Sequence, residues 1–349
     1  LLPMEDFFRN PDTAAFSISP DGTRLAFARP WEHRMNVYVR EIASGTEKRI
    51  TSATERDIAG FFWKGNNRIV YAQDSGGDEN FHVYITDIKG GEPRDLTPFE
   101  MTDHDGKLRA AASTDGVNTS ILYRTTEDQD FRVLITTNFK ETFSPIMFAY
   151  DNKLMYVVSN LSRDKTAIYT FDPEKNETLD LIFEHPEVDT GGLLHSKKRK
   201  VITGVVYLTD KRHYKFFDAD REELQKSLEE FFPHYEVGVA DIDDDERRVI
   251  VRTYSDRTRG TYYLYDRKDN SMSKLADLSS WLKEEQMASM RPITYTARDG
   301  LTIHGYLTLP VGVNSRDLPL VVIPHGGPSA RDAWGFDSEA QFLANRGIA

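Results

Sequence analysis

Short runs of alternating apolar and polar residues, separated by turn residues, fill the first 280 positions of the chain. In residues 16–51, the runs "TRLAFA" and "NVYVREI" place apolar side chains at about every second position, which is the period of half-buried β-strands. The sequence Pro20-Asp21-Gly22 precedes the first run and predicts a turn, because proline fixes φ and glycine accepts positive φ. This segment therefore predicts four strands joined by turns.

The same pattern recurs five more times. Its first turns fall at Asp21, Asn66, Asp115, Asn152, Lys197 and Asp244. Five steps span 223 residues, about 45 per copy, and four strands in 40–50 residues are typical of a β-propeller blade. We therefore predict a mainly β fold in which residues 1–10 are an N-terminal extension and residues 11–280 form a β-propeller of six to seven four-stranded blades. A β-sandwich is the competing fold, and the regular repeat disfavours it.

The pattern changes after Trp281. The run "SSWLKEEQMASMRP" predicts a helical connector ended by Pro292, and the next segment predicts a hairpin that turns at Asp299-Gly300, a strong hairpin signal. "LPLVVIP" (residues 318–324) is apolar throughout, as expected for a strand buried on both faces of a parallel sheet. "SEAQFLANRG" predicts a helix that ends at a glycine, with a new strand at "IA". Residues 281–349 thus predict a connector and the first strands of an α/β-hydrolase domain.

Composition excludes several classes of function. The formal net charge is −12, which argues against nucleic-acid binding, because binding phosphates requires a basic surface. No window reaches the roughly 18 consecutive apolar residues that a membrane helix needs. The absence of cysteine excludes disulfides, thiolate metal sites and a cysteine nucleophile, but leaves both bacterial cytoplasm and periplasm open. The nine histidines show no metal-ligand spacing, so no metal or cofactor is expected.

Candidate chemistry lies in "VIPHGGPSARDAWGFD", residues 322–337. His325 and Ser329 suggest a base and a nucleophile, but the chain contains no G-x-S-x-G elbow and Ser329 follows a proline. In α/β-hydrolases an early glycine loop supplies one N–H of the oxyanion hole. We therefore assign Gly326 and Gly327 to that role, with the Gly327 N–H as the donor. A tight turn without catalytic function is the alternative.

A second candidate lies in the helical insert "DREELQKSLEEF". Its paired carboxylates, Glu229 and Glu230, would suit the N-terminal ammonium of a peptide. Carboxylates on helix surfaces are common, however, and a solvated helix face is the alternative interpretation.

Several segments resemble the prolyl oligopeptidase family of serine peptidases, in particular bacterial members related to acylaminoacyl-peptidase and dipeptidyl-peptidase. They are "ARDGLTIHGYLTLP", "LPLVVIPHGGP", "RDAWGFD" and "QFLANRGIA", with "SPDGTRLAFARP" and "GGDENFHVY" in the blades. The resemblance implies a propeller that restricts access to an α/β-hydrolase domain, short peptides as substrates, and a Ser-Asp-His triad located after Ala349.

On this interpretation the partner of the chain is a C-terminal hydrolase segment, a homo-oligomer is left open, and the 349-residue chain alone is inactive. Two alternatives stay open. One is a non-catalytic propeller that acts as a binding or interaction module with a vestigial hydrolase tail. The other is an esterase or lipase.

Overall fold

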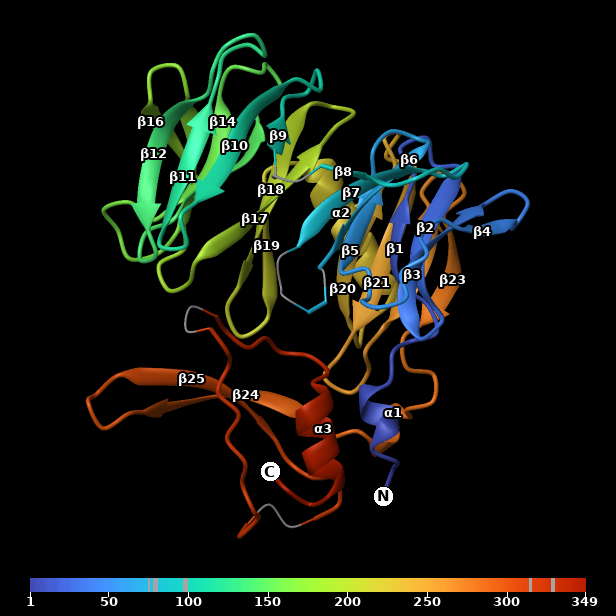
Figure 1. The fold of residues 1–349 in the computed structure, drawn as a ribbon. Helices are drawn as coiled ribbons and strands as arrows, with labels where there is room; N and C mark the ends of the chain where they lie inside the picture. Colours follow the sequence, from blue (N-terminus) through green and yellow to red (C-terminus); the bar gives the residue numbers. More distant parts are fainter. Residues whose placement is uncertain (75, 78–80, 97–99, 314–315, 328–329) are drawn as a thin grey trace. The chain divides into compact units, whose positions relative to one another are not determined.

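The computed structural model describes residues 1–74, 76–77, 81–96, 100–313, 316–327 and 330–349. It divides into two compact units, one formed by Leu1–Arg94 with Leu224–Ala349 and the other by Asp95–Glu223. Within the described residues, the strands form six consecutive antiparallel sheets and one separate hairpin (Figure 1). Neighbouring strands in each of the six sheets follow one another in the sequence. This arrangement confirms the predicted β-propeller class, with six blades.

The first unit contains blades 1, 2 and 6, each a sheet of four strands. Blade 1 comprises β1 (Ala14–Ile18), β2 (Arg24–Trp31), β3 (Arg34–Glu41) and β4 (Glu47–Arg49). Blade 2 comprises β5 (Gly60–Trp63), β6 (Arg68–Gln73), β7 (His82–Asp87) and β8 (Arg94–Asp95). Blade 6 comprises β20 (Glu236–Ile242), β21 (Arg248–Tyr254), β22 (Thr261–Asp266) and β23 (Ser271–Asp277).

Blades 1 and 6 contact each other through a backbone hydrogen bond from the Asp244 N–H to the Pro20 carbonyl (2.8 Å) and through side chains. The Asp241 carboxylate at the end of β20 accepts hydrogen bonds from the Ser17 hydroxyl (2.6 Å) and from the Ile18 N–H (2.9 Å) in β1. An apolar cluster covers the contact, and its buried members are Phe16, Ile18, Leu25, Phe27, Ile250, Tyr262 and Leu278. Burial of apolar side chains is the main stabilising term in such a contact.

The second unit contains blades 3, 4 and 5. Blade 3 comprises β9 (Glu100–Thr102), β10 (Leu108–Thr114), β11 (Asn118–Tyr123) and β12 (Arg132–Asn138). Blade 4 comprises β13 (Phe143–Phe148), β14 (Met155–Ser159), β15 (Ala167–Asp172) and β16 (Glu177–Phe183). Blade 5 comprises β17 (Thr190–Ser196), β18 (Val201–Leu208) and β19 (Arg212–Phe216).

Two details of the predicted repeat are wrong. The turn at Asp115 joins the second and third strands of blade 3, whereas the first turn lies at residues 103–107. The strand β9 has only three residues, too few to show alternation in the sequence. The predicted repeat therefore takes the second turn of blade 3 for its first. In blade 5 three strands pair within the described residues, and the chain then enters helix α2 (Ala219–Phe231).

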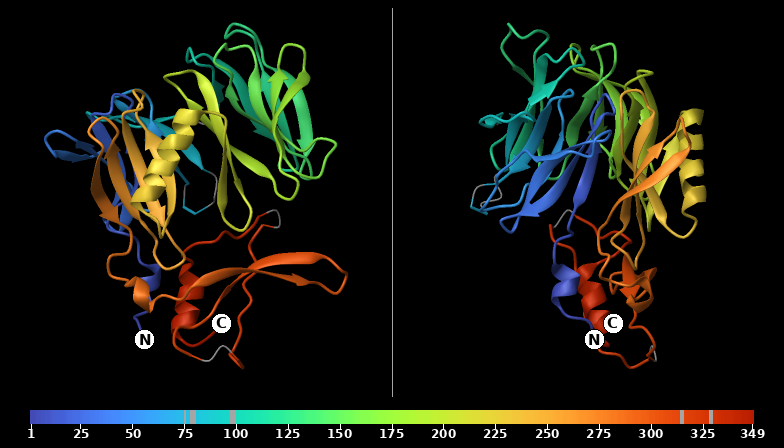
Figure 2. Two further views of the ribbon diagram at one scale, coloured as in Figure 1. Left: turned by 180° about the vertical axis from the view of Figure 1, so that it is seen from behind. Right: turned by 90° about the vertical axis from the view of Figure 1, so that its right-hand side faces the viewer.

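Helix α2 confirms the predicted helical insert. In the first unit, its residues Leu224 and Leu228 pack against Val237, Val249 and Val251 of blade 6. Figure 2 shows the helix lying along this sheet. The helix therefore buries its apolar stripe on the blade and leaves its opposite face to solvent.

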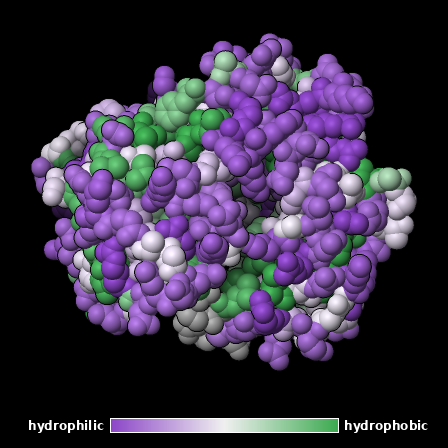
Figure 3. Space-filling model, turned by 90° about the horizontal axis from the view of Figure 1, so that it is seen from above, coloured by the Kyte–Doolittle hydropathy of each residue, from purple (hydrophilic) through white to green (hydrophobic). Residues whose placement is uncertain are grey.

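The molecular surface agrees with the acidic, polar composition. The face drawn in Figure 3 is mainly hydrophilic, with smaller hydrophobic areas between the polar side chains. Charged residues make up 29% of the sequence. In the described part of the chain, no helix has the length and apolar character needed to cross a bilayer.

An arginine at the start of the second strand recurs in three blades and connects each of them to its neighbour. Its guanidinium donates to a backbone carbonyl in a turn of the adjoining blade: Arg24 to Asn66 (3.2 Å), Arg109 to Asn152 (2.6 Å) and Arg248 to Gly22. We call these contacts the arginine latches. They join blade 1 to blade 2, blade 3 to blade 4, and blade 6 to blade 1.

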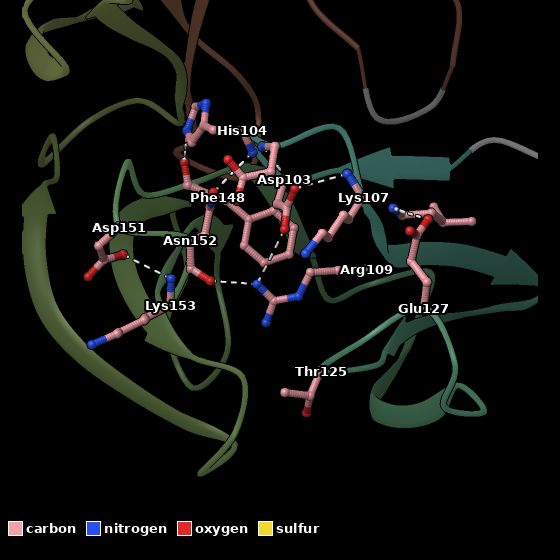
Figure 4. Close-up of polar contacts among 12 residues, drawn as sticks. Asp103, His104, Lys107, Arg109, Thr125, Glu127, Phe148, Asp151, Asn152 and Lys153 are labelled. Carbon is pink, nitrogen blue, oxygen red and sulfur yellow. Dashed lines mark hydrogen bonds and ion pairs between the residues drawn. The ribbon is translucent and has the colours of Figure 1, made fainter.

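The latch in blade 3 is the most buried of the three. Figure 4 shows the Arg109 guanidinium between Asp103 and the carbonyl of Asn152. The ion pair with Asp103 measures 3.6 Å, and the side chains of Arg109 and Asp103 are only 10% and 3% exposed. The guanidinium also donates to the Tyr123 hydroxyl and lies 5.0 Å from the centre of the Phe148 ring. This arginine therefore balances a carboxylate that is buried with it.

Three rings from blades 3, 4 and 5 meet in the second unit. The His104 ring stacks on Tyr150, with centroids 4.3 Å apart, and the Tyr150 hydroxyl lies 2.7 Å from Nδ1 of His195. His195 is an exposed residue, but desolvation of its ring, followed by the charges of Lys197 and His104, lowers its pKa below the usual 6.5. The fold therefore favours the neutral imidazole.

A lowered histidine pKa predicts a loss of stability in acid. Because the unfolded chain binds the proton more tightly than the folded unit does, stability that is fully present above about pH 6.5 falls as the pH drops below that value. We expect hydrogen exchange in blades 3 to 5 to accelerate more between pH 7.5 and 5.5, after correction for intrinsic rates, than it does in a His195→Gln variant. An equal pH response in the two proteins would contradict this role of His195.

The C-terminal part of the first unit begins with a connector. It contains one short 3-10 helix, η1 (Glu284–Gln286), where the sequence predicted a longer helix. Strand β24 (Met290–Thr296) then includes Pro292 and pairs with β25 (Thr302–Thr308) around the predicted Asp299-Gly300 turn. The connector prediction was wrong because Pro292 does not end a helix here, but occupies a strand of a two-stranded hairpin. Proline is tolerated on such an edge strand.

The predicted buried strand at residues 318–324 is also wrong. This segment is not a strand and is exposed, with Leu320 63% and Val322 78% accessible. Within the described residues, its backbone pairs only with Ala349, whose N–H donates to Pro319 (2.8 Å) and whose carbonyl accepts from Val321 (2.9 Å). These two bonds have the pattern of parallel strands. Neither residues 318–324 nor the predicted strand at Ile348-Ala349 forms a strand, because a buried parallel strand requires neighbours on both faces.

Helix α3 (Ser338–Asn345) confirms the prediction for "SEAQFLANRG". The Asp337 carboxylate accepts from the Ala340 N–H (2.7 Å) and caps the N-terminus. At the C-terminus Gly347 has a φ of +82°, and Gly347 and Ile348 donate to the carbonyls of Ala344 and Leu343. This is the Schellman motif, which requires the left-handed conformation that glycine adopts easily.

Candidate functional site

The glycine loop lies between the segment that pairs with Ala349 and helix α3. Gly326 and Gly327 are both exposed, and a side chain added to Gly326 would meet no atom within 4 Å. Gly327 has a φ of +138°, a conformation that is available mainly to glycine. The backbone is therefore open to close approach by a ligand, and its conformation depends on glycine at residue 327. Ser329 lies outside the described residues.

His325 does not lie in a catalytic arrangement. Its Nδ1 is 2.9 Å from the carbonyl oxygen of the adjacent Gly326, and the residue is exposed. The ring thus contacts its own loop rather than a carboxylate or hydroxyl from elsewhere in the described residues.

The far end of the loop is fixed at two points. The indole N–H of Trp334 donates to the Met290 carbonyl at the start of β24 (2.8 Å). Gly335 follows with a φ of +155°, and its Cα region lies against the Tyr254 ring. Asp337 then caps α3. The loop is consequently anchored to the hairpin and to the helix just after its exposed part.

Helix α3 is itself held by Gln341, which is 3% exposed. Its side-chain amide donates to the carbonyls of Asp256 (2.8 Å) and Ala288 (2.7 Å), and its oxygen accepts from the Ala288 N–H (2.9 Å). The Asp256 carboxylate in turn accepts from the Met290 N–H (2.7 Å). No local sequence signal points to Gln341, because its partners lie 53 and 85 residues away along the chain.

Glu229 and Glu230 lie on the last turn of α2, and both are exposed. Glu229 accepts a hydrogen bond from the amide of Gln225 (2.9 Å), which also donates to the Val237 carbonyl (2.8 Å). Gln225 is 2% exposed, so this bond fixes the position of one of the two carboxylates. The pair is accessible to a cation, but the described contacts do not bring it to the glycine loop.

Metal-ligand geometry is not found in the part of the chain that the structure describes. No group of three or more histidine or carboxylate side chains there is placed to hold an ion. The candidate site offers backbone N–H groups on an accessible glycine loop. Such groups stabilise developing negative charge on a substrate oxygen.

The chain combines a β-propeller with a hairpin, a parallel backbone pairing, a glycine loop and a capped helix. This combination defines the class: a propeller protein with hydrolase-type elements. No family model matches the chain. Dipeptidyl aminopeptidase BIII of Pseudoxanthomonas mexicana is 27% identical over 417 residues, covering 100% of this chain and 60% of the relative. Dipeptidyl peptidase family member 6 of Caenorhabditis elegans is 21% identical, with the same coverage. The chain is thus similar over its whole length to a dipeptidyl aminopeptidase and to a dipeptidyl peptidase family member.

Solved structures show the same fold. A puromycin hydrolase superposes with a TM-score of 0.64 at 16% identity, covering 100% of this chain and 67% of that one. The acylaminoacyl peptidase of Pyrococcus horikoshii superposes with a TM-score of 0.53 at 16% identity, covering 97% and 56%. The chain spans about 60% of the length of the curated relatives that it matches, a share consistent with an N-terminal part.

Proposed function

We propose that this chain is the N-terminal portion of a serine peptidase that hydrolyses short peptides, releasing aminoacyl, acylaminoacyl or dipeptidyl units. In this proposal the propeller restricts which peptides reach the active site. Gly326 and Gly327 form part of the oxyanion hole, while the serine, acid and histidine belong to a C-terminal hydrolase segment. The relatives support peptidase activity of the complete protein.

One observation carries the proposal. An accessible glycine loop, with φ of +138° at Gly327, lies between a parallel-paired segment and a capped helix. In α/β-hydrolases an early loop in this setting supplies an oxyanion N–H, while the nucleophile lies on a later elbow. A propeller that acted only as a binding module would have no need for such a loop.

The test is an assay with chromogenic aminoacyl, acylaminoacyl and dipeptidyl substrates. We expect no turnover by the 349-residue chain, because loss of a catalytic triad reduces kcat about a million-fold. A longer protein that adds a G-x-S-x-G segment should turn over at least one substrate and be blocked by a serine-directed phosphonate. Phosphonate-sensitive turnover by the short chain would contradict the proposal, as would an inactive longer protein that is folded.

Glu229 and Glu230 are the second part of the proposal, as acceptors for a peptide's N-terminal ammonium. Their exposure and the fixing of Glu229 by Gln225 support this role. In the active protein, Glu229→Gln should raise KM for substrates with a free N-terminus and leave KM for N-acylated substrates unchanged. Equal KM changes for the two substrate types would favour the interpretation as a solvated helix face.

A further inference from the structure

Residues 1–9, which we call the N-terminal strap, run across the C-terminal elements of the first unit. The N–H of Leu2 donates to the Asn345 side chain (2.9 Å), and Arg346 donates back to the Leu2 carbonyl (2.9 Å). Helix α1 (Glu5–Phe8) places Phe7 on the Phe342 ring, with centroids 5.9 Å apart. Figure 1 shows α1 and α3 beside each other. The beginning of the chain is thus packed on its last helix.

The strap also contacts the connector that leaves blade 6. The Trp281 indole donates to the Asp6 carbonyl (2.8 Å), and the Arg9 guanidinium lies 3.6 Å from the centre of the Trp281 ring. Phe7 is fully buried in a cluster with Leu282 and Met287. The chain passes between the blades and the C-terminal elements twice, once at the strap and once at the connector. These two segments therefore pack against each other and stabilise each other.

One arginine connects all of these parts. Arg259, in the loop between β21 and β22, donates to the carbonyls of Phe7 and Arg9 (2.9 Å to Arg9) and to the Ser338 hydroxyl (3.0 Å) at the start of α3. Every one of these acceptors is neutral, and burial, with a smaller effect of Arg9, lowers the pKa of the guanidinium. A cation desolvated in this way is costly unless its hydrogen bonds are satisfied, so the acceptors must stay in place.

We propose that Arg259 is a clamp that locks the N-terminal strap and α3 onto blade 6, so that blade 6, the strap and the helix behind the glycine loop move as one body. Releasing the clamp frees the strap while the blades stay folded. The strap is therefore a conformational device, and its release is the local opening that detaches α3 from the propeller. This inference does not depend on peptidase activity.

Limited trypsin digestion tests the clamp directly. Trypsin cleaves after Arg9, whose carbonyl is bonded to Arg259 and whose side chain is stacked on Trp281. Arg9 and Asn10 are exposed, but these contacts hold the backbone in place, so faster cleavage at this bond reports their release. When opening is fast relative to cleavage, the rate follows the population of the open form. Cleavage at Lys268, exposed in the turn between β22 and β23, serves as the internal standard.

We expect Arg259→Met to accelerate cleavage at Arg9 about tenfold relative to Lys268, the effect of losing charge-assisted bonds that close the strap. Arg257→Met is the matched control, because Arg257 lies in the same loop but is exposed, and it should change the ratio less than about twofold. Equal ratios for the Arg259 and Arg257 variants would overturn the proposal.

A second variant covers the case in which Arg259→Met does not fold. Arg346→Met removes the bond to Leu2 and the stacking on Phe342, where the guanidinium lies 4.1 Å from the ring centre. This substitution leaves unchanged the loop between β21 and β22, which contains Arg259. We expect it to accelerate cleavage at Arg9 a few-fold without changing cleavage at Lys268. No change at Arg9 in this folded variant would overturn the proposal.

Discussion

Replacing Gly327 by alanine in the complete, active protein should lower kcat about a hundredfold and change KM little. The φ of +138° at this residue is one that an alanine rarely adopts, so the substitution moves the peptide unit whose N–H is assigned to the oxyanion hole. Loss of one such donor typically reduces kcat by about 10²–10³. The donor acts mainly on the transition state, which is why the effect should fall on kcat rather than on substrate binding.

The matched control for this variant is Gly305→Ala. Gly305 lies in β25, and an added side chain there would only touch Ile293 at 3.9 Å. Both variants should show the same thermal unfolding by tryptophan fluorescence, since the glycine loop is exposed. A Gly327→Ala enzyme with unchanged kcat would remove this loop from the catalytic machinery. A similar loss in both variants would indicate a general effect on the hairpin and loop.

Local patterns predicted most of the fold. Alternation within single strands and turn residues such as Pro20-Asp21-Gly22 depend on neighbours in the sequence, so the blade repeat and the 299–300 hairpin turn could be read directly. The same holds for α3, whose C-terminal glycine adopts a φ of +82°. The repeat was misread at blade 3 because β9 has only three residues, too few for a period to be visible.

Features that depend on distant partners could not be predicted. The glycine loop was found from its composition, but the contacts that support it join residues far apart in the sequence. Arg259 and Phe7 are 252 positions apart, and Gln341 and Asp256 are 85 apart. Likewise, the apolar run at residues 318–324 predicted a buried strand that does not form, because burial is a property of the surrounding elements. The sequence therefore predicts the residues of the candidate site but not the contacts that hold these residues in place.

The latch at Arg109 gives the largest expected effect on stability. Arg109→Met should destabilise the second unit by about 3–5 kcal/mol, because it leaves the buried Asp103 carboxylate without its cation. All four tryptophans, residues 31, 63, 281 and 334, belong to the first unit. Urea unfolding followed by tryptophan fluorescence therefore reports on that unit, while hydrogen exchange in β10, β11 and β13 reports on the second. We expect faster exchange in these strands and a smaller change in the fluorescence transition.

Two further variants separate the buried charge pair from general packing. Lys107→Met removes a positive charge two residues away, from an exposed side chain, and should change stability by less than about 0.5 kcal/mol. Adding Asp103→Asn to Arg109→Met removes the uncompensated charge as well, so the double variant should be more stable than Arg109→Met alone. If the second substitution only adds to the damage, the contribution of Arg109 lies in its hydrogen bond to Asn152 and its packing on Phe148, and the latch would operate without the ion pair.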